Sequence, residues 1–297
     1  MRSLDQLTTE QANPRTADID RLDALGVLQR LNDEDLLVAP AVRVALPDLA
    51  RAVDLALERW ERGGRVILFG AGTSGRLAML DAAELGPTFG VPAERYVARL
   101  AGGRSAFFEA IEGAEDERDA GSAAAADLSA QDIAVGIAAS GRTPWVLGAL
   151  EEARRRGAAT VGMACVSRPS LASYTDVCIV VETGPEAISG STRLKAGTAQ
   201  KLVLNAFSST LMIRLGKVYG NLMVDVRATN AKLRHRAVRL VQQAAGVDAR
   251  AAERVLSDAD WDVKTAIASV RLSLSITEAA HRLAESGGRL GDVLGEP

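Results

Sequence analysis

RVILFGAGTSGR, at Arg65–Arg76, is the stretch from which the fold of this 297-residue chain can be worked out. Its apolar run, Val66–Phe69, predicts a buried strand, and the glycines that follow predict a tight turn into an apolar helix. This arrangement aims free backbone N–H groups and the positive end of a helix dipole at one point, which makes an anion site. Gly70, Gly72 and Gly75 also match the G-x-G-x-x-G pattern, so either a dinucleotide or a smaller phosphate could bind here.

Four more apolar runs downstream predict strands, at Arg95–Leu100, Asp132–Ala138, Thr160–Cys165 and Asp176–Val181. Helical segments separate most of them, and one helix is expected through Phe107, Phe108 and Ile111. Strands that alternate with helices require right-handed crossovers. We therefore expect a five-stranded, mostly parallel sheet with helices on both faces, an α/β/α sandwich.

Expected helices flank the strand region on both sides. Before it, an extended arm (Ser3–Asp18) leads to helices at Ile19–Asn32 and Ala39–Trp60, the second kinked or restarted at Pro47. After it come a long helix from Ala196 to about Leu215, another over Val224–Ala245, and short helices from Gly246 onwards. We divide the chain into an N-terminal arm and helix at 1–40, an α/β domain at 41–245 and a small C-terminal three-helix domain at 246–297.

Composition limits the classes of function. A formal net charge of −3 without a basic run argues against a nucleic-acid partner. No window is long and apolar enough for a membrane span or a signal peptide, so we expect a soluble, cytoplasmic protein with no membrane partner. Cys165 and Cys178 lie in apolar segments, as buried free thiols do. With only His235 and His281 besides, the chain predicts no metal site and no Ser-His-Asp triad.

A second turn, AASGRTP at Ala138–Pro144, follows the third expected strand and resembles the first. The carboxyl ends of parallel strands share one edge of the sheet, so both turns can converge on one ligand. Hydroxyl-bearing turns suit a phosphomonoester, whereas a dinucleotide needs an acidic residue after the second strand, where Ala101 and two glycines stand. We therefore expect a phosphosugar, and the nominated ligands of its phosphate are Thr73, Ser74, Ser140, Gly141 and Thr143.

Two glutamates are candidates for acid–base chemistry. Glu84 is expected to end the helix that begins at Ser74, just before Gly86-Pro87, where the helix dipole and an apolar setting both disfavour ionisation. Glu115 lies in an acidic run that is more typical of a solvated face, so spacing alone nominates it weakly. A helix from Ser74 to Glu84 spans about 15 Å, longer than a hexose. We therefore hypothesise a homodimer with sites completed at or near the subunit interface.

These motifs resemble a known family. The two turns resemble those of sugar isomerase (SIS) domains, which are five-stranded α/β/α sandwiches that bind phosphosugars. The segment GPEAISGSTRLKAGTAQK, Gly184–Lys201, resembles the signature shared by N-acetylmuramic acid 6-phosphate etherases and the glucokinase regulatory protein. Further resemblance to the etherases runs through Thr8–Glu10, Leu31–Asp35, Leu80–Glu84, Ile111–Asp116 and Gly216–Val224. The C-terminal segment resembles the family's small UBA-like helical domain, and the length fits one SIS domain rather than the two of the regulator.

The resemblance implies a carbon–oxygen lyase that acts without cofactor or metal in peptidoglycan recycling. It would convert N-acetylmuramic acid 6-phosphate into N-acetylglucosamine 6-phosphate and D-lactate by elimination and then hydration. The family's two catalytic glutamates correspond to Glu84, which follows Ala83 where etherases often have serine, and to Glu115. We assign Glu84 as the acid on the ether oxygen and Glu115 as the base at C2. Arg193 and Lys195 are further phosphate candidates, and Glu186 is a candidate sugar contact.

Other functions remain open at this point. A non-catalytic phosphosugar-binding regulator would need the same turns but no carboxylate pair, and a nucleotide-dependent oxidoreductase would use the glycine pattern. An aldose–ketose phosphate isomerase shares the fold and the proton abstraction at C2 but lacks a leaving group at C3. Release of D-lactate therefore distinguishes an etherase from an isomerase.

Overall fold

The computed structural model describes residues 8–226, 228 and 230–296. The first part of the expected N-terminal arm, Ser3–Leu7, lies outside these residues. The chain separates into two compact units, one formed by residues up to Ala82 with Ala93–Ser208 and the other by Ala83–Pro92 with the residues from Ser209 onwards. The sequence-based division at residues 40 and 245 stays a prediction.

The first unit is built around a five-stranded sheet in the order β2-β1-β3-β4-β5. The strands are β1 (Val66–Gly70), β2 (Tyr96–Leu100), β3 (Ile133–Ile137), β4 (Ala159–Ala164) and β5 (Val177–Val180). All neighbouring strands are parallel, which confirms the predicted sheet. The order reverses between β1 and β3, and at their carboxyl ends Gly70 pairs with Ile137. Parallel α/β sheets bind ligands at such a switch point.

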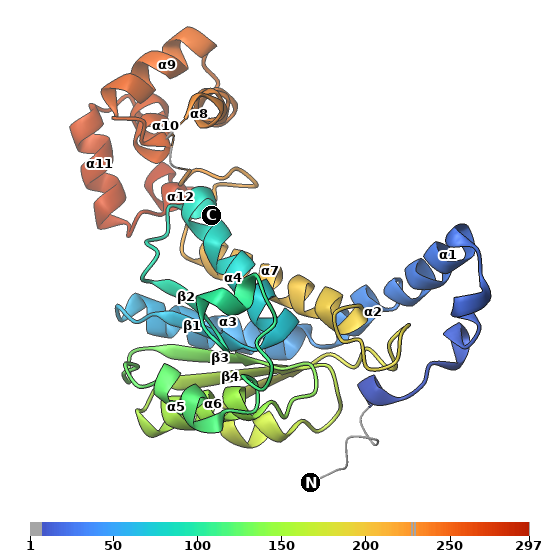
Figure 1. Cartoon of the computed structure of the whole chain (residues 1–297). Helices are drawn as coiled ribbons and strands as arrows, with labels where there is room; N and C mark the ends of the chain where they lie inside the picture. The colour runs from blue at the N-terminus through green and yellow to red at the C-terminus, as the bar shows by residue number, and fades with distance from the viewer. Residues whose placement is uncertain (1–7, 227, 229, 297) are drawn as a thin grey trace. The chain divides into compact units, whose positions relative to one another are not determined.

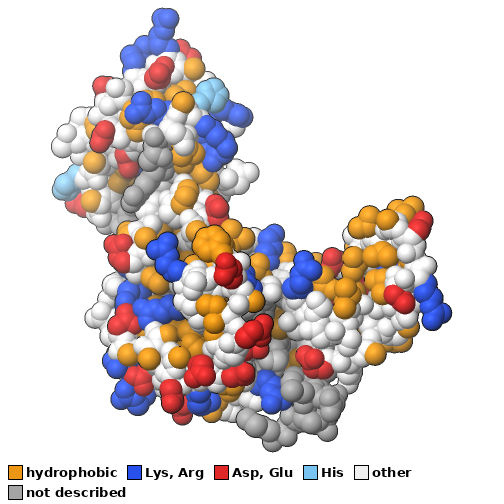
Figure 2. All heavy atoms as spheres, in the orientation of Figure 1, with side chains coloured by type: hydrophobic (Ala, Val, Ile, Leu, Met, Phe, Trp, Pro, Cys, Tyr) orange, Lys and Arg blue, Asp and Glu red, His pale blue; other side chains and the backbone are white. Residues whose placement is uncertain are grey.

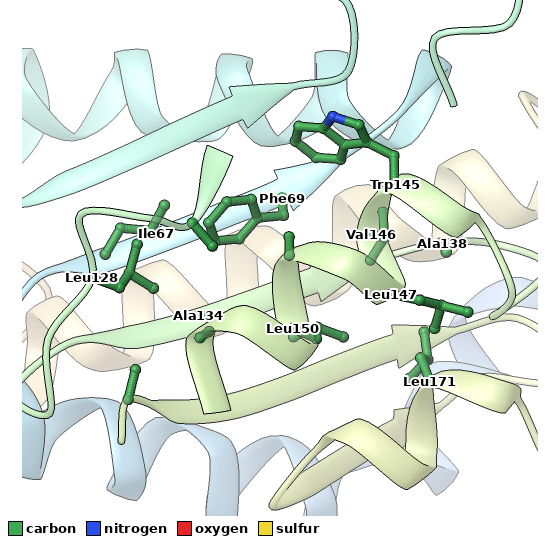
Figure 3. Packing of buried hydrophobic residues seen from close by; sticks show 14 of the residues in the cluster. Ile67, Phe69, Leu128, Ala134, Ala138, Trp145, Val146, Leu147, Leu150 and Leu171 are labelled. Carbon is green, nitrogen blue, oxygen red and sulfur yellow. The ribbon is translucent and has the colours of Figure 1, made fainter. Parts of the chain in front are cut away.

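Helices cover both faces of this sheet. α5 (Arg118–Ala124) and α6 (Pro144–Arg155) lie on one face and α3 (Leu46–Glu61) on the other (Figure 1). Between α6 and the sheet, Phe69 packs against Trp145 with ring centres 6.0 Å apart (Figure 3). Burial of apolar surface contributes about 25 cal/mol per Å² to the free energy of folding, so this contact holds α6 against the sheet. Because the turn after β3 leads directly into α6, the packing of α6 also fixes the position of that turn.

The remaining α-helices are distributed along the whole chain. They are α1 (Ala24–Asp35), α2 (Val38–Val44), α4 (Gly72–Phe89), α7 (Lys195–Arg214), α8 (Ala231–Ala245), α9 (Ala249–Asp258), α10 (Val263–Leu272), α11 (Ile276–Glu285) and α12 (Leu290–Leu294). α8 to α12 share an apolar core of their own in the second unit, with Leu240, Leu256 and Ile267 among its buried members. In the described part of the chain, no helix combines the length and the apolar character that crossing a membrane requires.

Two expected helix limits are wrong because hydrogen bonds decide where each helix ends or begins. α4 does not end at Gly86-Pro87 but continues to Phe89, since proline removes only one bond and the N–H of Gly90 still donates to the carbonyl of Gly86 at 3.0 Å. α8 begins at Ala231 rather than Val224, because the Asn230 side chain accepts the Leu233 N–H at 2.9 Å and caps the helix there.

The helix expected through Phe107, Phe108 and Ile111 is also wrong. A short 3₁₀ helix, Arg104–Phe107, is followed by turns, and the next α-helix is α5. Arg76 explains the difference, because its guanidinium donates to the carbonyls of Ala106 and Phe107 at 2.8 and 3.0 Å. A continuing α-helix would need those carbonyls for its own bonds. Pro47, by contrast, separates α2 from α3 and stands in the first turn of α3, as one of the two predicted alternatives has it.

Candidate active site

The turn after β1 requires glycine because the neighbouring atoms are packed closely against it. A Cβ on Gly75 would lie 2.3 Å from Cδ1 of Leu100 and 2.6 Å from the carbonyl oxygen of Gly70. Any side chain at Gly75 would therefore push the first turn of α4 away from β1 and β2. The glycines allow α4 to begin directly at the strand end, with Thr73 and Ser74 in its first turn.

The turn after β3 is constrained in the same way. Gly141 adopts a φ of +64°, and a Cβ there would lie 2.2 Å from the Cβ of Pro169. Next to it, Ser140 Oγ accepts the N–H of Arg142 at 3.4 Å. Thr143 occupies the N-cap position of α6, but its side chain makes no capping hydrogen bond. The helix therefore leaves the Thr143 hydroxyl to other partners.

The two turns line one cavity of about 540 Å³ within the first unit. Four of the predicted phosphate ligands line it, namely Thr73, Ser74, Ser140 and Thr143, and Gly141 lies between two of them in the chain. Glu115, one of the two predicted catalytic residues, lines it as well. The volume is in the range of sites for small molecules, which is roughly 300–1,000 Å³.

Charged residues that the sequence analysis did not assign to the site complete the lining. They are Glu10, Asp116, Arg118 and Arg142. Glu10 comes from the N-terminal segment, and its carboxylate lies against Gly190 of the signature loop. The TTE resemblance at residues 8–10 is the signal that could have pointed to Glu10. The cavity thus joins hydroxyl donors, guanidinium groups and carboxylates, a set that can hold an anionic sugar and move protons.

Glu84 does not line this cavity. It lies in α4 five residues before Phe89, the last residue of the helix, and its side chain is exposed. Neither a helix terminus nor an apolar environment acts on this carboxyl in the structure. The environment predicted for Glu84 is therefore wrong, because α4 extends past Pro87 and Leu80, one turn earlier, is itself exposed.

Two charged residues of the signature loop, Glu186 and Lys195, are buried in the protein interior. Glu186 is fully buried, and its two carboxylate oxygens accept the backbone N–H groups of Lys195 and Ala196 at 2.8 and 2.9 Å. Burial raises the pKa of Glu186, and these two bonds oppose that effect. Glu186 therefore caps the start of α7, where free N–H groups need acceptors.

Lys195 is also buried, with 1% of its surface exposed. Its Nζ donates to Glu34 Oε2 at 2.5 Å, and Arg15 Nε donates to Glu34 Oε1 at 2.5 Å. Arg15 first, then Lys195, lower the pKa of Glu34 to about 2 despite its burial. Lys195 does not line the cavity, and neither does Arg193, which is exposed. Sequence spacing could not find this ion-pair network, because its members come from distant segments.

The N-terminal segment runs along the signature loop. Asn13 Nδ2 donates to the carbonyl of Pro185 at 3.3 Å, and Thr16 Oγ1 donates to that of Ala187 at 2.8 Å. Further along, Ser189 Oγ donates to the Glu10 carbonyl at 3.0 Å. These bonds, together with the Glu34 ion pairs, hold Glu10 at the cavity.

A further buried carboxylate lies within α4. Asp81 accepts hydrogen bonds from the Tyr96 hydroxyl and from Ser208 Oγ, both at 2.9 Å. Burial raises the pKa of Asp81 to about 6, although the two hydrogen bonds favour the ionised form. Asp81 thereby links α4 to β2 and to α7, the two elements that carry its partners.

A larger cavity, of about 690 Å³, lies within the second unit and contains none of the predicted site residues. Lys217 and Lys264 line it, and both pair with Asp225, at 2.5 and 2.6 Å. Asp225 thus offsets one of these two positive charges within the protein. Within residues 8–226, 228 and 230–296, no three His, Cys, Asp or Glu side chains are close enough together to hold a metal ion.

Family models match most of the chain. The glucokinase regulatory protein N-terminal SIS domain matches residues 48–154, the SIS domain matches 112–209, and the C-terminal lid domain of glucokinase regulatory protein matches 220–285. An E. coli CFT073 protein, solved as a complex with a ligand, has a TM-score of 0.50 and 17% identity over 67% of this chain and 97% of that chain. A Bacteroides fragilis protein named as a phosphosugar isomerase involved in capsule formation has a TM-score of 0.50 and 21% identity over 67% and 95%. These two likenesses show the fold.

Relatives of much higher identity cover nearly the whole chain. Proteins named N-acetylmuramic acid 6-phosphate etherase from Deinococcus radiodurans and Mycolicibacterium smegmatis are each 51% identical over 98% of this chain, and the matches cover 96% and 99% of their own lengths. The protein of that name from Salmonella typhi is 48% identical over 98% of this chain and 99% of its own.

The parallel sheet, the hydroxyl-lined cavity at its switch point and the matched models define a SIS-domain protein. The family within that class follows from the near full-length identity. The chain belongs to the N-acetylmuramic acid 6-phosphate etherase family.

Proposed function

We propose that this protein is an enzyme that cleaves the D-lactyl ether of N-acetylmuramic acid 6-phosphate, giving N-acetylglucosamine 6-phosphate and D-lactate. The observation that carries the proposal is the 51% identity to two etherases over 98% of the chain. The cavity at the strand ends supports it, because its hydroxyl donors and its carboxylate suit a phosphosugar that must lose a proton.

The phosphate is held by the two turns. In this proposal Thr73, Ser74, Ser140 and Thr143 donate hydroxyl hydrogen bonds, and Gly141 lets the second turn approach closely. The first turn of α4 adds free backbone N–H groups and the positive end of its dipole. Arg193 and Lys195 are left out of the phosphate site, since neither lines the cavity.

Glu115 acts as the base at C2. The open-chain aldehyde acidifies the C2 proton, and its removal leaves an electron pair that forms the C2–C3 double bond. The C3–O bond breaks as the lactyl oxygen receives a proton from Glu84, which releases D-lactate. Water then adds across the double bond, its hydroxyl to C3 and a proton to C2, and restores a saturated sugar. The protein's part is to hold the phosphate and exchange these protons.

Glu84 reaches the reaction through a second copy of the chain. Along α4, Glu84 lies about 15 Å from Ser74, so a neighbouring subunit is the more direct source of the acid. Apolar exposure supports a homodimer, since six exposed large apolar side chains lie between residues 25 and 46 (Figure 2), namely Leu25, Leu28, Leu36, Leu37, Val44 and Leu46. Leu80, one turn before Glu84 on α4, is exposed as well.

We also place the protein in the cytoplasm, where the etherase reaction would serve peptidoglycan recycling. Both cysteines are free thiols, Cys165 buried and Cys178 partly so. Burial raises the pKa of Cys165 to about 12, which keeps the thiol protonated and unreactive. Such thiols fit a reducing compartment.

An assay for D-lactate tests the function. The purified protein, supplied with N-acetylmuramic acid 6-phosphate in D₂O, is expected to release D-lactate and to leave deuterium at C2 of the sugar product. Glu115→Gln is expected to lose about 100-fold or more in kcat. Glu117→Gln is the matched control, because Glu117 belongs to the same acidic run but does not line the cavity. If the wild-type protein releases no lactate, the proposal is wrong.

A mixture of two inactive variants tests the dimer. Glu84→Gln and Glu115→Gln are each expected to be inactive, and mixed dimers should regain activity if Glu84 of the partner subunit completes the site. Subunit exchange is verified by mass spectrometry of differently tagged chains. Verified exchange without recovered activity would place both glutamates in one chain's site and contradict the dimer proposal.

A further inference from the structure

We propose that Arg118 binds the carboxylate of the lactyl group and thereby makes the cavity selective for sugar phosphates that carry an acidic ether. This inference rests on the proposed function. The substrate has two anionic groups, the phosphate and the lactyl carboxylate, and the turns at the strand ends account for only the first. A second anion in this cavity needs a cation of its own.

The need for a cation follows from the carboxylates that line the cavity. Glu115 and Asp116 both line the cavity, and two carboxylates would repel a third that approached them. The cationic side chains among the described lining residues are Arg118 and Arg142. A guanidinium donates charge-assisted hydrogen bonds to a carboxylate, and these are stronger than bonds between neutral groups.

Arg118 is better placed than Arg142 for this role. Arg142 belongs to the turn between Ser140 and Thr143, which faces the phosphate in the proposed site. Arg118 follows the proposed base, Glu115, by three residues. In the proposed reaction Glu115 acts at C2, and the lactyl ether leaves from C3, the adjacent carbon. Arg118, the cavity cation nearer to the base in the chain, is therefore the one that we place at the ether.

The guanidinium of Arg118 is held in a defined orientation. Its Nη2 donates to Glu151 Oε2 at 2.8 Å and to the Tyr174 hydroxyl at 3.2 Å, and its central carbon lies 5.4 Å from the centre of the Tyr174 ring. Both of these hydrogen bonds are made by Nη2. Within the described residues, Nε and Nη1 make no such bond, so their N–H groups can donate to a ligand carboxylate.

The backbone around Arg118 is fixed too. The carbonyl of Glu115 accepts the N–H of Trp145 at 3.0 Å, and Ser122 Oγ donates to the carbonyl of Gly148 at 3.1 Å. Both bonds tie the segment around α5 to α6, which itself packs on the sheet. A guanidinium on a rigid support loses little freedom when it binds, so its full interaction is available for selectivity.

Two ligands that differ only at C3 test the inference. For the wild-type protein, we expect N-acetylmuramic acid 6-phosphate to bind about 10- to 100-fold more tightly than the 3-O-ethyl ether of N-acetylglucosamine 6-phosphate, which lacks the carboxylate. Arg118→Met should abolish this difference by weakening only the lactyl compound. The inhibition constant of N-acetylglucosamine 6-phosphate should change by less than about threefold, because that ligand keeps the phosphate contacts.

Two further variants serve as controls for Arg118→Met. Arg118→Lys keeps the charge but not the fork, and it should retain part of the preference even if Arg118→Met folds poorly. Arg155→Met removes an exposed arginine of α6 that pairs with Glu152 and should change neither constant. Equal weakening of both ligands would assign Arg118 to the phosphate, and an unchanged preference would remove it from binding. Either outcome overturns the inference, while release of D-lactate by the wild-type protein still supports the proposed function.

Discussion

The two strand-end turns and the signature loop both carry polar residues typical of the family, yet the structure uses them in opposite ways. The turns place Ser74 and Ser140 on a cavity, whereas the loop turns Glu186 and Lys195 inwards. Every helix start has free N–H groups that need acceptors. At α4 and α6 a ligand can supply them, but the start of α7 is buried, so Glu186 does so. A motif characteristic of a family therefore shows that certain polar groups need partners. Only the surrounding structure shows whether a ligand or another part of the protein supplies those partners.

The comparison is tested most strongly at Lys195. Lys195→Met leaves Glu34 with one partner fewer in a buried site, and loss of one member of a buried pair costs about 3–5 kcal/mol. The free energy of unfolding, measured in urea, should fall by that amount. Arg193→Met, two residues away and exposed, should change it by less than about 0.5 kcal/mol. If Lys195→Met were as stable as the wild type but bound phosphosugar poorly, Lys195 would belong to the ligand site after all.

Acid unfolding sharpens the same point. Because the pKa of Glu34 is lowered from 4.5 to about 2 in the folded state, its ionised form stabilises the protein above pH 4.5, and that contribution is lost as the pH falls towards 2. Arg15→Met removes the largest cause of the shift, so acid unfolding should begin at a higher pH. Circular dichroism across this pH range measures it, with Arg21→Met, which replaces an exposed arginine, as control. An unchanged acid midpoint would show that the Arg15 bond contributes nothing.

The turns should respond in activity rather than in stability. Ser74→Ala and Ser140→Ala each remove a hydroxyl expected to donate to the phosphate, and a hydrogen bond to a charged group contributes about 1.5–3 kcal/mol. KM should rise about 10- to 100-fold, while the free energy of unfolding changes by less than about 1 kcal/mol. Steady-state kinetics and urea unfolding on the same preparations separate the two effects. A loss of stability without a change in KM would make the turns structural, like the signature loop.

The last effect, expected at Asp81, is confined to the pH dependence of stability. Its pKa is raised from 3.8 to about 6 in the folded state, so ionisation opposes folding. The stability that comes from the protonated form is complete below pH 3.8 and is lost as the pH rises through 6. Asp81→Asn should flatten this slope between those two pH values, measured by urea unfolding at several points. A slope that persists in the variant would have to come from another group.

Much of the fold could be predicted because its signals are local. Apolar runs located all five strands, and the alternation of strands and helices indicated a parallel sheet. One error came where a distant group intervened. Arg76 takes carbonyls that a helix through Phe107 would have used, and local propensity carries no information on such a contact.

The candidate site, too, contains features that local sequence predicts and features that depend on tertiary contacts. The two strand-end turns could be placed together from sequence because each follows a strand of the parallel sheet, and neighbouring parallel strands end at the same edge. The environment of Glu84 was predicted wrongly because the length of α4 depends on whether one lost bond at Pro87 ends the helix. Arg118 was missed because nothing in its own segment points to a cavity, and Glu10 was missed although the TTE resemblance at residues 8–10 could have pointed to it.

Patterns among residues that are close in sequence were thus sufficient to predict the sheet, the two turns and the family. Spacing, turn glycines and motifs are all properties of neighbouring residues. The tertiary structure alone settled which charged side chains face the cavity and which are buried in ion pairs. Lys195 and Glu34 are 161 residues apart, and their pairing depends on where the chain brings them together. Burial removes water from both groups, and it is this loss of hydration, invisible in sequence, that makes each charge require the other.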